Sequence, residues 1–220
     1  MQISSAFQSG RLAIGTLLAF GLFAQAQPPT EGQGIPPRTA PADYQAKAEA
    51  GTVTIAADFV GHAVPTPQGA LTSEDFVAFE VAVYGPAGAR LKLSFEDFSI
   101  RINGKKMPAL AQQFGLVMRS LKDPEWQPET PPDSPKSKGG MSTGGGGAQG
   151  DPKPEPPKMP FPLRRAMEQR VQKVVLPEGD RALPLSGLIF FSYRGKDQSI
   201  HNVELIYSGP AGKATLTIEQ

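Results

Sequence analysis

The feature that most constrains the fold of this chain is the alternation of apolar and polar residues over short segments. Between positions 52 and 59, Val53, Ile55 and Phe59 are separated by smaller or polar residues. Successive side chains of a β-strand point to opposite faces, so this spacing predicts a strand with one apolar face. Similar segments recur along the chain, and turns rich in proline and glycine separate them.

Further segments show the same period or a continuous apolar run of strand length. They are 77–83, 91–95, 98–102, 114–121, 188–193, 203–207 and 214–218. Phe76 and Tyr84 lie opposite the main apolar face of their strand, which indicates partial burial on both sides. About seven short strands with one helix predict an all-β fold, an immunoglobulin-like antiparallel β-sandwich.

Two local signals refine this prediction. The alternation jumps by one residue at Glu96-Asp97, which indicates either a bulge or a strand that changes sheets. Asn103-Gly104 is the strongest hairpin signal, because a type I′ turn needs positive φ at both central residues.

Helical spacing appears over 163–175. Leu163, Met167 and Val171 share one face, and Arg164 and Arg165 lie on the other. Such a helix packs its apolar face over one end of a sandwich, or docks its basic face on a partner or an anionic membrane. The segment 42–50 is also compatible with a short helical turn.

A proline- and glycine-rich segment, 123–162, interrupts this pattern. Eleven of its 40 residues are proline and seven are glycine. It lacks the apolar content needed to offset the entropy cost of ordering, so we expect a disordered insertion with polyproline II character near 152–162. The flanks together are the size of one domain, which predicts a single domain over 51–220 interrupted by this insertion.

The first 26 residues match a secretory signal peptide. Arg11 precedes an apolar stretch over 12–23, and a small-x-small site ends at Ala26. We therefore expect a secreted or periplasmic protein, cleaved near Ala26, in which 27–50 is a proline-rich linker. An uncleaved membrane anchor is the alternative. The chain has no cysteine, which excludes disulfides and a lipidated cysteine, so the fold must depend on its hydrophobic core.

Four stretches resemble a known family. They are FVAFEVAVYG, FSIRINGKKMPA, LPEGDRALPLSGLIFFSY and VELIYSG, within 76–209. Their order is similar to that of the telokin-like, immunoglobulin-like domain of unknown function found in bacterial lipoproteins and secreted proteins. The resemblance implies a non-catalytic module and supplies no site residues. The insertion and the missing lipidation cysteine depart from the family pattern.

Catalytic and metal chemistry are not expected. Asp197, Ser199 and His201 are neighbours in sequence, but strand neighbours alternate between faces and a catalytic triad is assembled in space, so a structural histidine is expected. The acidic pairs Glu74-Asp75 and Glu96-Asp97 are typical of solvated turns. Two histidines without cysteine or ligand spacing provide no metal site. We expect neither an enzyme nor a cofactor.

The net charge of +1 gives no reason to expect nucleic acid as a partner. We also expect no stable membrane insertion after signal cleavage, because no later segment reaches the apolar length of a spanning helix. The sequence favours a non-catalytic binding or adaptor module that contacts an envelope protein through a sheet edge, end loops or the insertion. The candidate partner-binding residues are Trp126, Pro154, Pro157, Pro160, Arg164 and Arg165. The alternatives are a polysaccharide-binding or hydrolytic envelope enzyme and an assembly factor for exported proteins.

Overall fold

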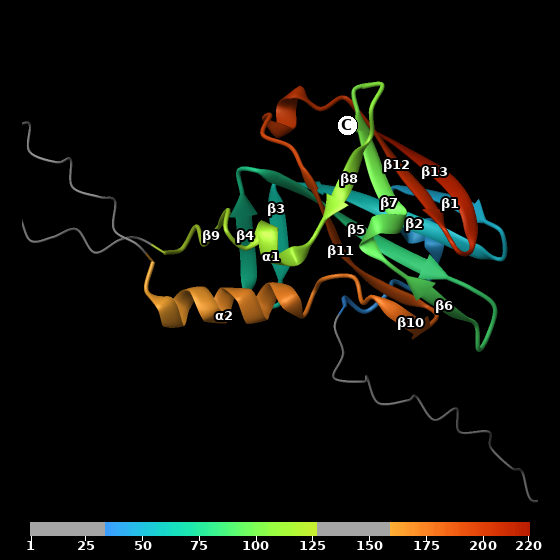
Figure 1. Cartoon of the computed structure of the whole chain (residues 1–220), viewed down its shortest axis with the longest axis horizontal. Helices are drawn as coiled ribbons and strands as arrows, with labels where there is room; N and C mark the ends of the chain where they lie inside the picture. The colour runs from blue at the N-terminus through green and yellow to red at the C-terminus, as the bar shows by residue number, and fades with distance from the viewer. Residues whose placement is uncertain (1–33, 127–158) are drawn as a thin grey trace, which may run out of the picture. The chain divides into compact units, whose positions relative to one another are not determined.

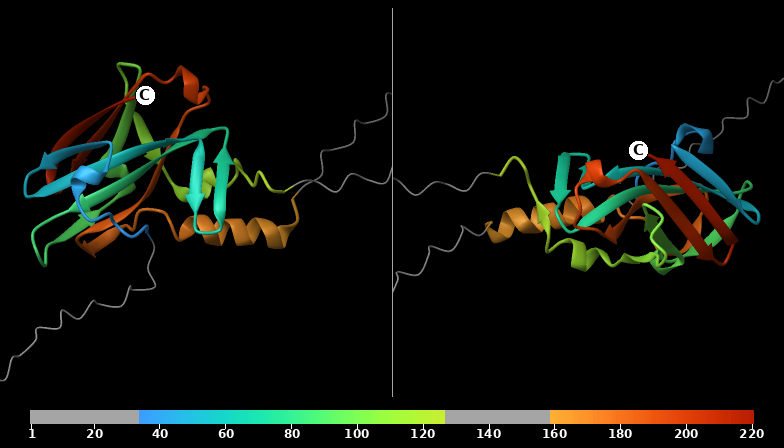
Figure 2. Two further views of the ribbon diagram at one scale, coloured as in Figure 1. Left: turned by 180° about the vertical axis from the view of Figure 1, so that it is seen from behind. Right: turned by 90° about the horizontal axis from the view of Figure 1, so that it is seen from above.

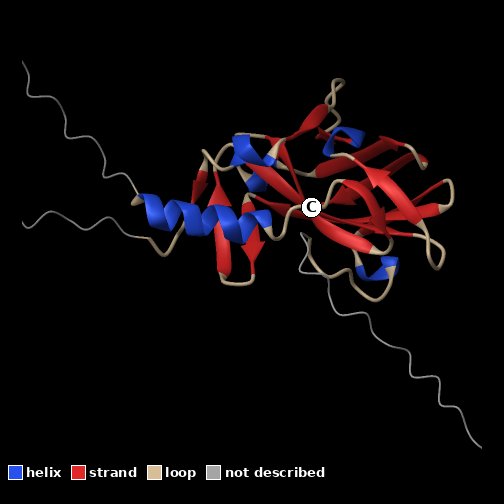
Figure 3. Cartoon of the chain, turned by 60° about the horizontal axis from the view of Figure 1, so that its bottom comes forward, coloured by secondary structure: helices blue, strands red, loops and turns tan. Residues whose placement is uncertain are grey.

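The structure, a computed structural model, describes residues 34–126 and 159–220. Strands dominate the described residues and pair antiparallel within the sheets (Figure 3), which confirms the all-β class. The largest sheet has eight strands in the order β1 (Ala46–Ala50), β2 (Val53–Gly61), β5 (Phe76–Tyr84), β11 (Leu185–Ser192), β8 (Ala109–Gln112), β7 (Phe98–Ile102), β12 (Asn202–Gly209) and β13 (Gly212–Glu219).

The eight-stranded sheet curls until its outer strands, β1 and β13, lie beside each other. Their hairpin turns also meet, because a Cβ at Gly51 would lie 2.3 Å from the carbonyl oxygen of Ala211. Elsewhere in the sheet, β8 joins β11 and β7 through only two residue pairs each. The sheet therefore approaches a barrel with one incomplete side, the seam, where β8 fills only part of the space between β11 and β7.

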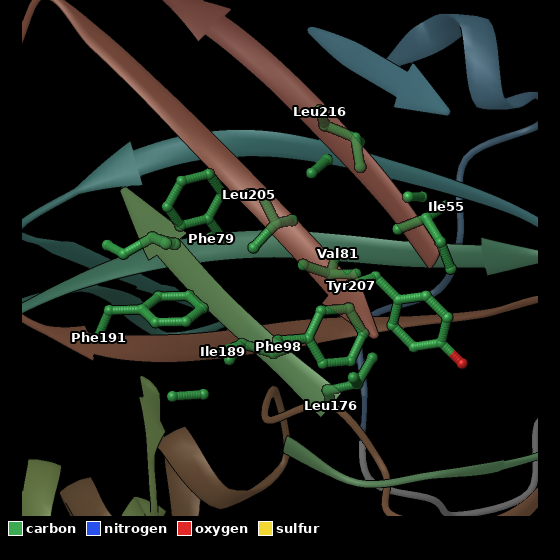
Figure 4. Close-up of a cluster of buried hydrophobic side chains, with 14 of the residues drawn as sticks. Ile55, Phe79, Val81, Phe98, Leu176, Ile189, Phe191, Leu205, Tyr207 and Leu216 are labelled. Atoms are coloured by element: carbon green, nitrogen blue, oxygen red, sulfur yellow. The ribbon is translucent and has the colours of Figure 1, made fainter. Parts of the chain in front are cut away.

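The inner face of the curled sheet holds the main core (Figure 4). Phe79 on β5 and Phe191 on β11 pack edge to face, with ring centroids 5.6 Å apart. In the other half of the sheet, the rings of Phe98 on β7 and Tyr207 on β12 lie 5.1 Å apart. All four side chains are fully buried. The two halves of the sheet therefore share one hydrophobic interior.

Smaller elements complete the described residues (Figure 1). Two further sheets consist of β10 (Gly179–Ala182) with β6 (Arg90–Leu93), and of β3 (Ala63–Thr66), β4 (Gly69–Ser73) and β9 (Leu121–Lys122). The helical elements are the 3₁₀ turns η1 (Pro41–Asp43), η2 (Phe95–Asp97) and η3 (Asp197–Ser199), and the helices α1 (Phe114–Val117) and α2 (Phe161–Gln172).

The jump in alternation at Glu96-Asp97 marks a change of sheet. β6 pairs with β10, whereas β7 belongs to the large sheet, and η2 lies between them. Ser94 caps η2: its Oγ accepts from the N–H of Glu96 at 3.2 Å, and its own N–H donates to Asp97 at 3.1 Å. Of the two explanations offered by the sequence, the strand that changes sheets is correct.

Asn103-Gly104 follows β7 with φ values of 52° and 68°, as its hairpin signal predicts. The connection to β8 is longer than a two-residue turn and covers 103–108. The Asn103 side chain fixes the start of this connection to the segment before β12. Its amide donates to the Ser199 carbonyl oxygen at 2.7 Å, and its Oδ1 accepts from the N–H of His201 at 2.9 Å.

Two secondary-structure expectations are wrong. The strand expected over 114–121 is α1, a turn over 118–120 and β9, and Val117 and Leu121 are the buried residues of this segment, whereas Leu116 is exposed, so the expected alternation is not followed. The helical turn over 42–50 is also wrong over most of its length. Residues 46–50 form β1, in which three alanines alternate with two charged residues along an edge of the large sheet.

Residues 34–45 lie within the segment expected to be a linker, but they pack against the large sheet as an arm. The Arg38 guanidinium stacks 4.2 Å from the centre of the Tyr44 ring. The hydroxyl of Tyr84 donates to the carbonyl oxygen of Arg38 at 2.8 Å. Together with β1, the arm makes the described part of the expected linker an integral part of the fold.

Arg38 also compensates a repulsion within the sheet. Asp58 on β2 and Glu80 on β5 stand directly opposite each other. Like charges in this position destabilise a sheet. The Arg38 guanidinium bonds both carboxylates, so one cation serves two strands.

We predict that Arg38→Met lowers the free energy of unfolding by about 1–2 kcal/mol, because two facing carboxylates lose their shared cation. Urea unfolding measures this loss. Arg90→Met is the matched control: Arg90 pairs with Asp180 where both side chains are exposed, and its loss should stay below about 0.5 kcal/mol. Equal losses would show that Arg38 contributes no more than an ordinary surface ion pair.

The helix predicted over 163–175 is observed as α2, and it creates a second core on the outer face of the large sheet. Met167 and Val171 of α2 are buried in one cluster with Leu188 and Phe190 of β11. The helix also lies against β3 (Figure 2). β11 is thus buried on both faces, which explains its continuous apolar sequence.

Gly187 on β11 allows the chain that follows α2 to cross close to the sheet. A Cβ at this position would lie 2.4 Å from Cα and 2.5 Å from N of Leu176. Main-chain bonds fix the crossing, since the N–H of Leu188 donates to Val174 at 2.7 Å and the N–H of Leu176 donates to Leu188 at 3.0 Å. Both obstructing atoms are backbone, so only glycine fits without displacing the strand or the crossing chain.

Gly187→Ala should therefore lower the free energy of unfolding by about 2–4 kcal/mol, measured by thermal or urea denaturation. Gly115→Ala is the matched control, because a Cβ at Gly115 meets nothing within 4 Å, and its change should stay within about 0.5 kcal/mol. A Gly187→Ala protein as stable as the control would contradict the close crossing.

Candidate functional site

The two ends of the insertion are tied together at its base. Arg170 on α2 bonds Asp123 at 3.0 Å, and both side chains are largely buried. Trp126, a candidate partner-binding residue, lies three residues after Asp123 and is half-buried. Its backbone N–H donates to the Asp123 carbonyl oxygen at 3.1 Å. Trp126 therefore lies in a turn that the Arg170 ion pair anchors to α2.

The remaining candidates from the sequence lie on α2 or outside the described residues. Pro160, Arg164 and Arg165 are exposed together on the first turns of α2. Phe161 is exposed beside them, with the Arg164 guanidinium 6.0 Å from its ring centre. Pro154 and Pro157 lie outside the described residues. The structure thus groups three of the six candidates into one basic, proline-capped surface.

The sequence neighbours Ser199 and His201 make no hydrogen-bonded nucleophile–base pair. Ser199 Oγ lies 2.8 Å from the Tyr193 hydroxyl and donates to the Lys196 carbonyl oxygen at 2.6 Å. His201 is exposed, and its backbone N–H donates to Asn103. The hydroxyl of Ser199 thus serves the turn in which it lies.

The histidine that approaches Asp197 is His62, at the end of β2. Its Nε2 lies 3.6 Å from Oδ1 of Asp197. Its two ring nitrogens lie 3.0 and 2.7 Å from the carbonyl oxygens of Phe76 and Gly195. Both nitrogens are therefore directed at backbone oxygens, which fixes the ring between two loops.

The two residues of the acidic pair bind different cations: Glu74 pairs with Lys122 at 2.6 Å, and Asp75 pairs with Arg194 at 2.8 Å. Over 34–126 and 159–220, no group of three histidine, aspartate or glutamate side chains could hold a metal ion. These carboxylates therefore act as surface ion pairs between loops.

A pocket of about 250 Å³ opens at the seam. It lies between the two cores, because Leu176 and Ile189 of its lining belong to the main core and Leu188 to the second core. Aromatic side chains from three distant segments and three polar side chains also line it: Phe95, Phe114, Phe190, Gln112, Gln113 and Glu178. Three separate parts of the chain thus converge here on an apolar hollow with a polar edge.

Exposed apolar side chains also lie on β8 and α1, the elements that contribute Gln112 and Phe114 to the pocket. Leu110 and Leu116 are 63% and 45% exposed, and we call them the apolar patch. Met107 is 85% exposed but lies in the connection before β8, at the end of that strand away from the pocket. Leu110 shares the outer face of β8 with the pocket residue Gln112, since strand side chains alternate. Leu116 follows the pocket residue Phe114 within α1. Apolar surface that remains in water beside a pocket is typical of an interaction site.

Another part of the pocket edge, at η2 and Glu178, is acidic. Glu178 lines it, and Glu96 and Asp97 follow the pocket residue Phe95; we call these three the acidic rim. The Glu178 carboxylate accepts from the N–H of Phe95 at 3.0 Å and from the Ser94 hydroxyl at 3.3 Å. Burial raises the pKa of Asp97, and the charges of Glu96 and Glu178 raise it further, against the lowering effect of the hydrogen bond from Ser94.

The Asp97 pKa yields a pH-dependent prediction. Because its folded pKa lies above the unfolded value, Asp97 contributes stability at pH below the unfolded value and loses it as pH rises through the folded value. Asp97→Asn keeps an acceptor for Ser94 but removes the charge. The variant should become the more stable of the two proteins as pH rises from about 3 to 7, by urea unfolding at each pH. An unchanged difference in stability across this range would contradict the raised pKa.

No family model, no curated protein and no solved structure matches this chain. Within the part of the chain that the structure describes, no helix is long and apolar enough to cross a membrane. The resemblance to telokin-like domains stays a prediction, and the candidate site depends on geometry alone.

Sequence reasoning did not identify the pocket. Phe95 and Phe114 lie in segments predicted to be strands, and Glu178 lies between the predicted helix 163–175 and the predicted strand 188–193. Leu110 lies between the predicted strands 98–102 and 114–121, and Leu116 lies within the second of them, so neither residue marks a binding surface in the sequence. Their exposure depends on how β8 crosses the seam, which no local pattern encodes.

Proposed function

We propose that this protein is a non-catalytic binding module that receives an apolar side chain of a partner protein in the seam pocket. The observation that carries the proposal is the apolar pocket of about 250 Å³ with the exposed side chains of Leu110 and Leu116 on the neighbouring β8 and α1. The patch extends the apolar surface beyond the pocket, which favours a macromolecule over a small ligand.

The proposal includes location and fold relationship. The signal-peptide pattern ending at Ala26 supports a secreted or periplasmic protein, and the partner is then an envelope protein. The antiparallel sheet with its shared core supports an immunoglobulin-like relationship. The basic face of α2 with Arg164 and Arg165 is a secondary contact, next to the base of the insertion.

The deciding test is affinity capture from envelope extract with the protein that begins at Gln27. Gln113→Trp should reduce capture at least about tenfold, because an indole at this exposed lining position covers the pocket. Gln113 is exposed, so the change should leave the thermal unfolding temperature nearly unaltered. Gln198→Trp, at an exposed position in η3, is the matched control and should capture the same partner at full yield.

A second variant separates the pocket from the insertion. Replacing 127–158 with a glycine-serine linker leaves the Asp123–Arg170 pair and α2 intact. Capture that survives this replacement but not Gln113→Trp supports the pocket. A partner that Gln113→Trp retains and the linker variant loses would overturn the proposal and make the insertion the binding element.

A further inference from the structure

The edge of the seam pocket is asymmetric. Its β8 side is apolar, with Leu110 and Leu116 exposed, and its η2 side carries the carboxylates of Glu96, Asp97 and Glu178. An occupant that enters the pocket therefore meets apolar surface at β8 and α1 and negative charge at η2 and Glu178. This inference rests on the proposed function and specifies the chemistry of the partner.

We propose that the partner presents an extended segment in which a leucine-sized or aromatic side chain fills the pocket and a neighbouring lysine or arginine lies on the acidic rim. The pocket is below the usual size for an enclosed small-molecule site, and one large side chain suits it. The cation follows from charge complementarity, which favours the correct partner and opposes acidic ones.

Glu178 is the central member of this rim because its carboxylate is held in place. One oxygen, Oε1, accepts from the backbone of Phe95 and the hydroxyl of Ser94. Arg181 is close by, but its Nε donates to the main-chain carbonyl oxygen of Glu178 at 2.8 Å. The carboxylate is thus oriented by neutral donors, and no residue of 34–126 or 159–220 bonds its second oxygen, which we assign to the incoming cation.

The neighbouring segments of this chain cannot move to fill the pocket, which leaves it to a side chain of a partner. It is built where two separate cores meet, at Leu176 on one side and Leu188 on the other. Gly187 between them brings the backbone of Leu176 against β11, so the crossing chain cannot shift to close the hollow. An apolar side chain inserted there gains contacts with both cores.

The probes are synthetic peptides of equal length with a central leucine flanked by two lysines, two serines or two glutamates, and a lysine-flanked peptide with central alanine. Binding to the isotope-labelled protein is followed by backbone amide shifts. The lysine-flanked leucine peptide should shift the amides of Phe95 and Glu178. It should bind about three- to fivefold more tightly than the serine peptide, and the alanine peptide should bind at least about tenfold more weakly.

Glu178→Gln keeps an acceptor for Phe95 and removes the charge. It should abolish the preference for lysine over serine flanks and leave the affinity for the serine peptide unchanged. Glu219→Gln, an exposed position on β13, is the matched control and should preserve the preference.

The outcomes separate this inference from the proposed function. Equal affinity for the three flanks, with shifts at Phe95 and capture still lost in Gln113→Trp, overturns the basic flank but leaves the pocket as the binding site. Shifts confined to residues outside the seam, with capture unaffected by Gln113→Trp, overturn both. Tight binding of the glutamate-flanked peptide would reverse the proposed chemistry.

Discussion

The close crossing of the chain over β11 at Gly187 determines much of the arrangement described above. Because no side chain intervenes, Val174 and Leu176, on the two sides of Val175, both bond to the backbone of Leu188, and the segment that leaves α2 is fixed to the middle of the sheet. This attachment holds α2 over the outer face and directs Leu176 into the main core. It also places Glu178 beside Phe95, so the acidic side of the pocket depends on the same contact.

The seam follows from an imbalance in strand length. β11 and β12 each have eight residues, whereas β8, which must join the two halves of the sheet, has four. It pairs with β11 through one end and with β7 through the other. The remaining space is covered by η2, α1 and the crossing chain rather than by a strand. Side chains from such separate elements pack less completely than a continuous sheet, which leaves a hollow between two well-packed cores.

The sequence predicted those parts whose pattern is local. The alternation of Val53, Ile55 and Phe59, the spacing of Met167 and Val171, and the turn at Asn103-Gly104 each report on their own segment, and each is observed. The segments 46–50 and 114–121 differ from their predicted structure, because alanine and isolated apolar residues suit either a helix or a strand and tertiary pairing decides between them. The arm packs on the sheet because Arg38 bonds two carboxylates that are distant from it in sequence. The pocket forms where three distant segments converge. The spacing of residues within one segment predicts neither feature.

Binding at the pocket is coupled to folding, because the residues that line it come from distant segments. Phe95, Phe114 and Glu178 come from segments far apart in the chain, and they approach one another only when the large sheet has closed and α2 has docked. An occupant that contacts all three therefore binds the folded chain and not the unfolded one, and it stabilises the fold by mass action. For a chain without disulfides, whose stability depends on two cores that meet at a hollow, such an occupant completes the packing where the sheet itself does not.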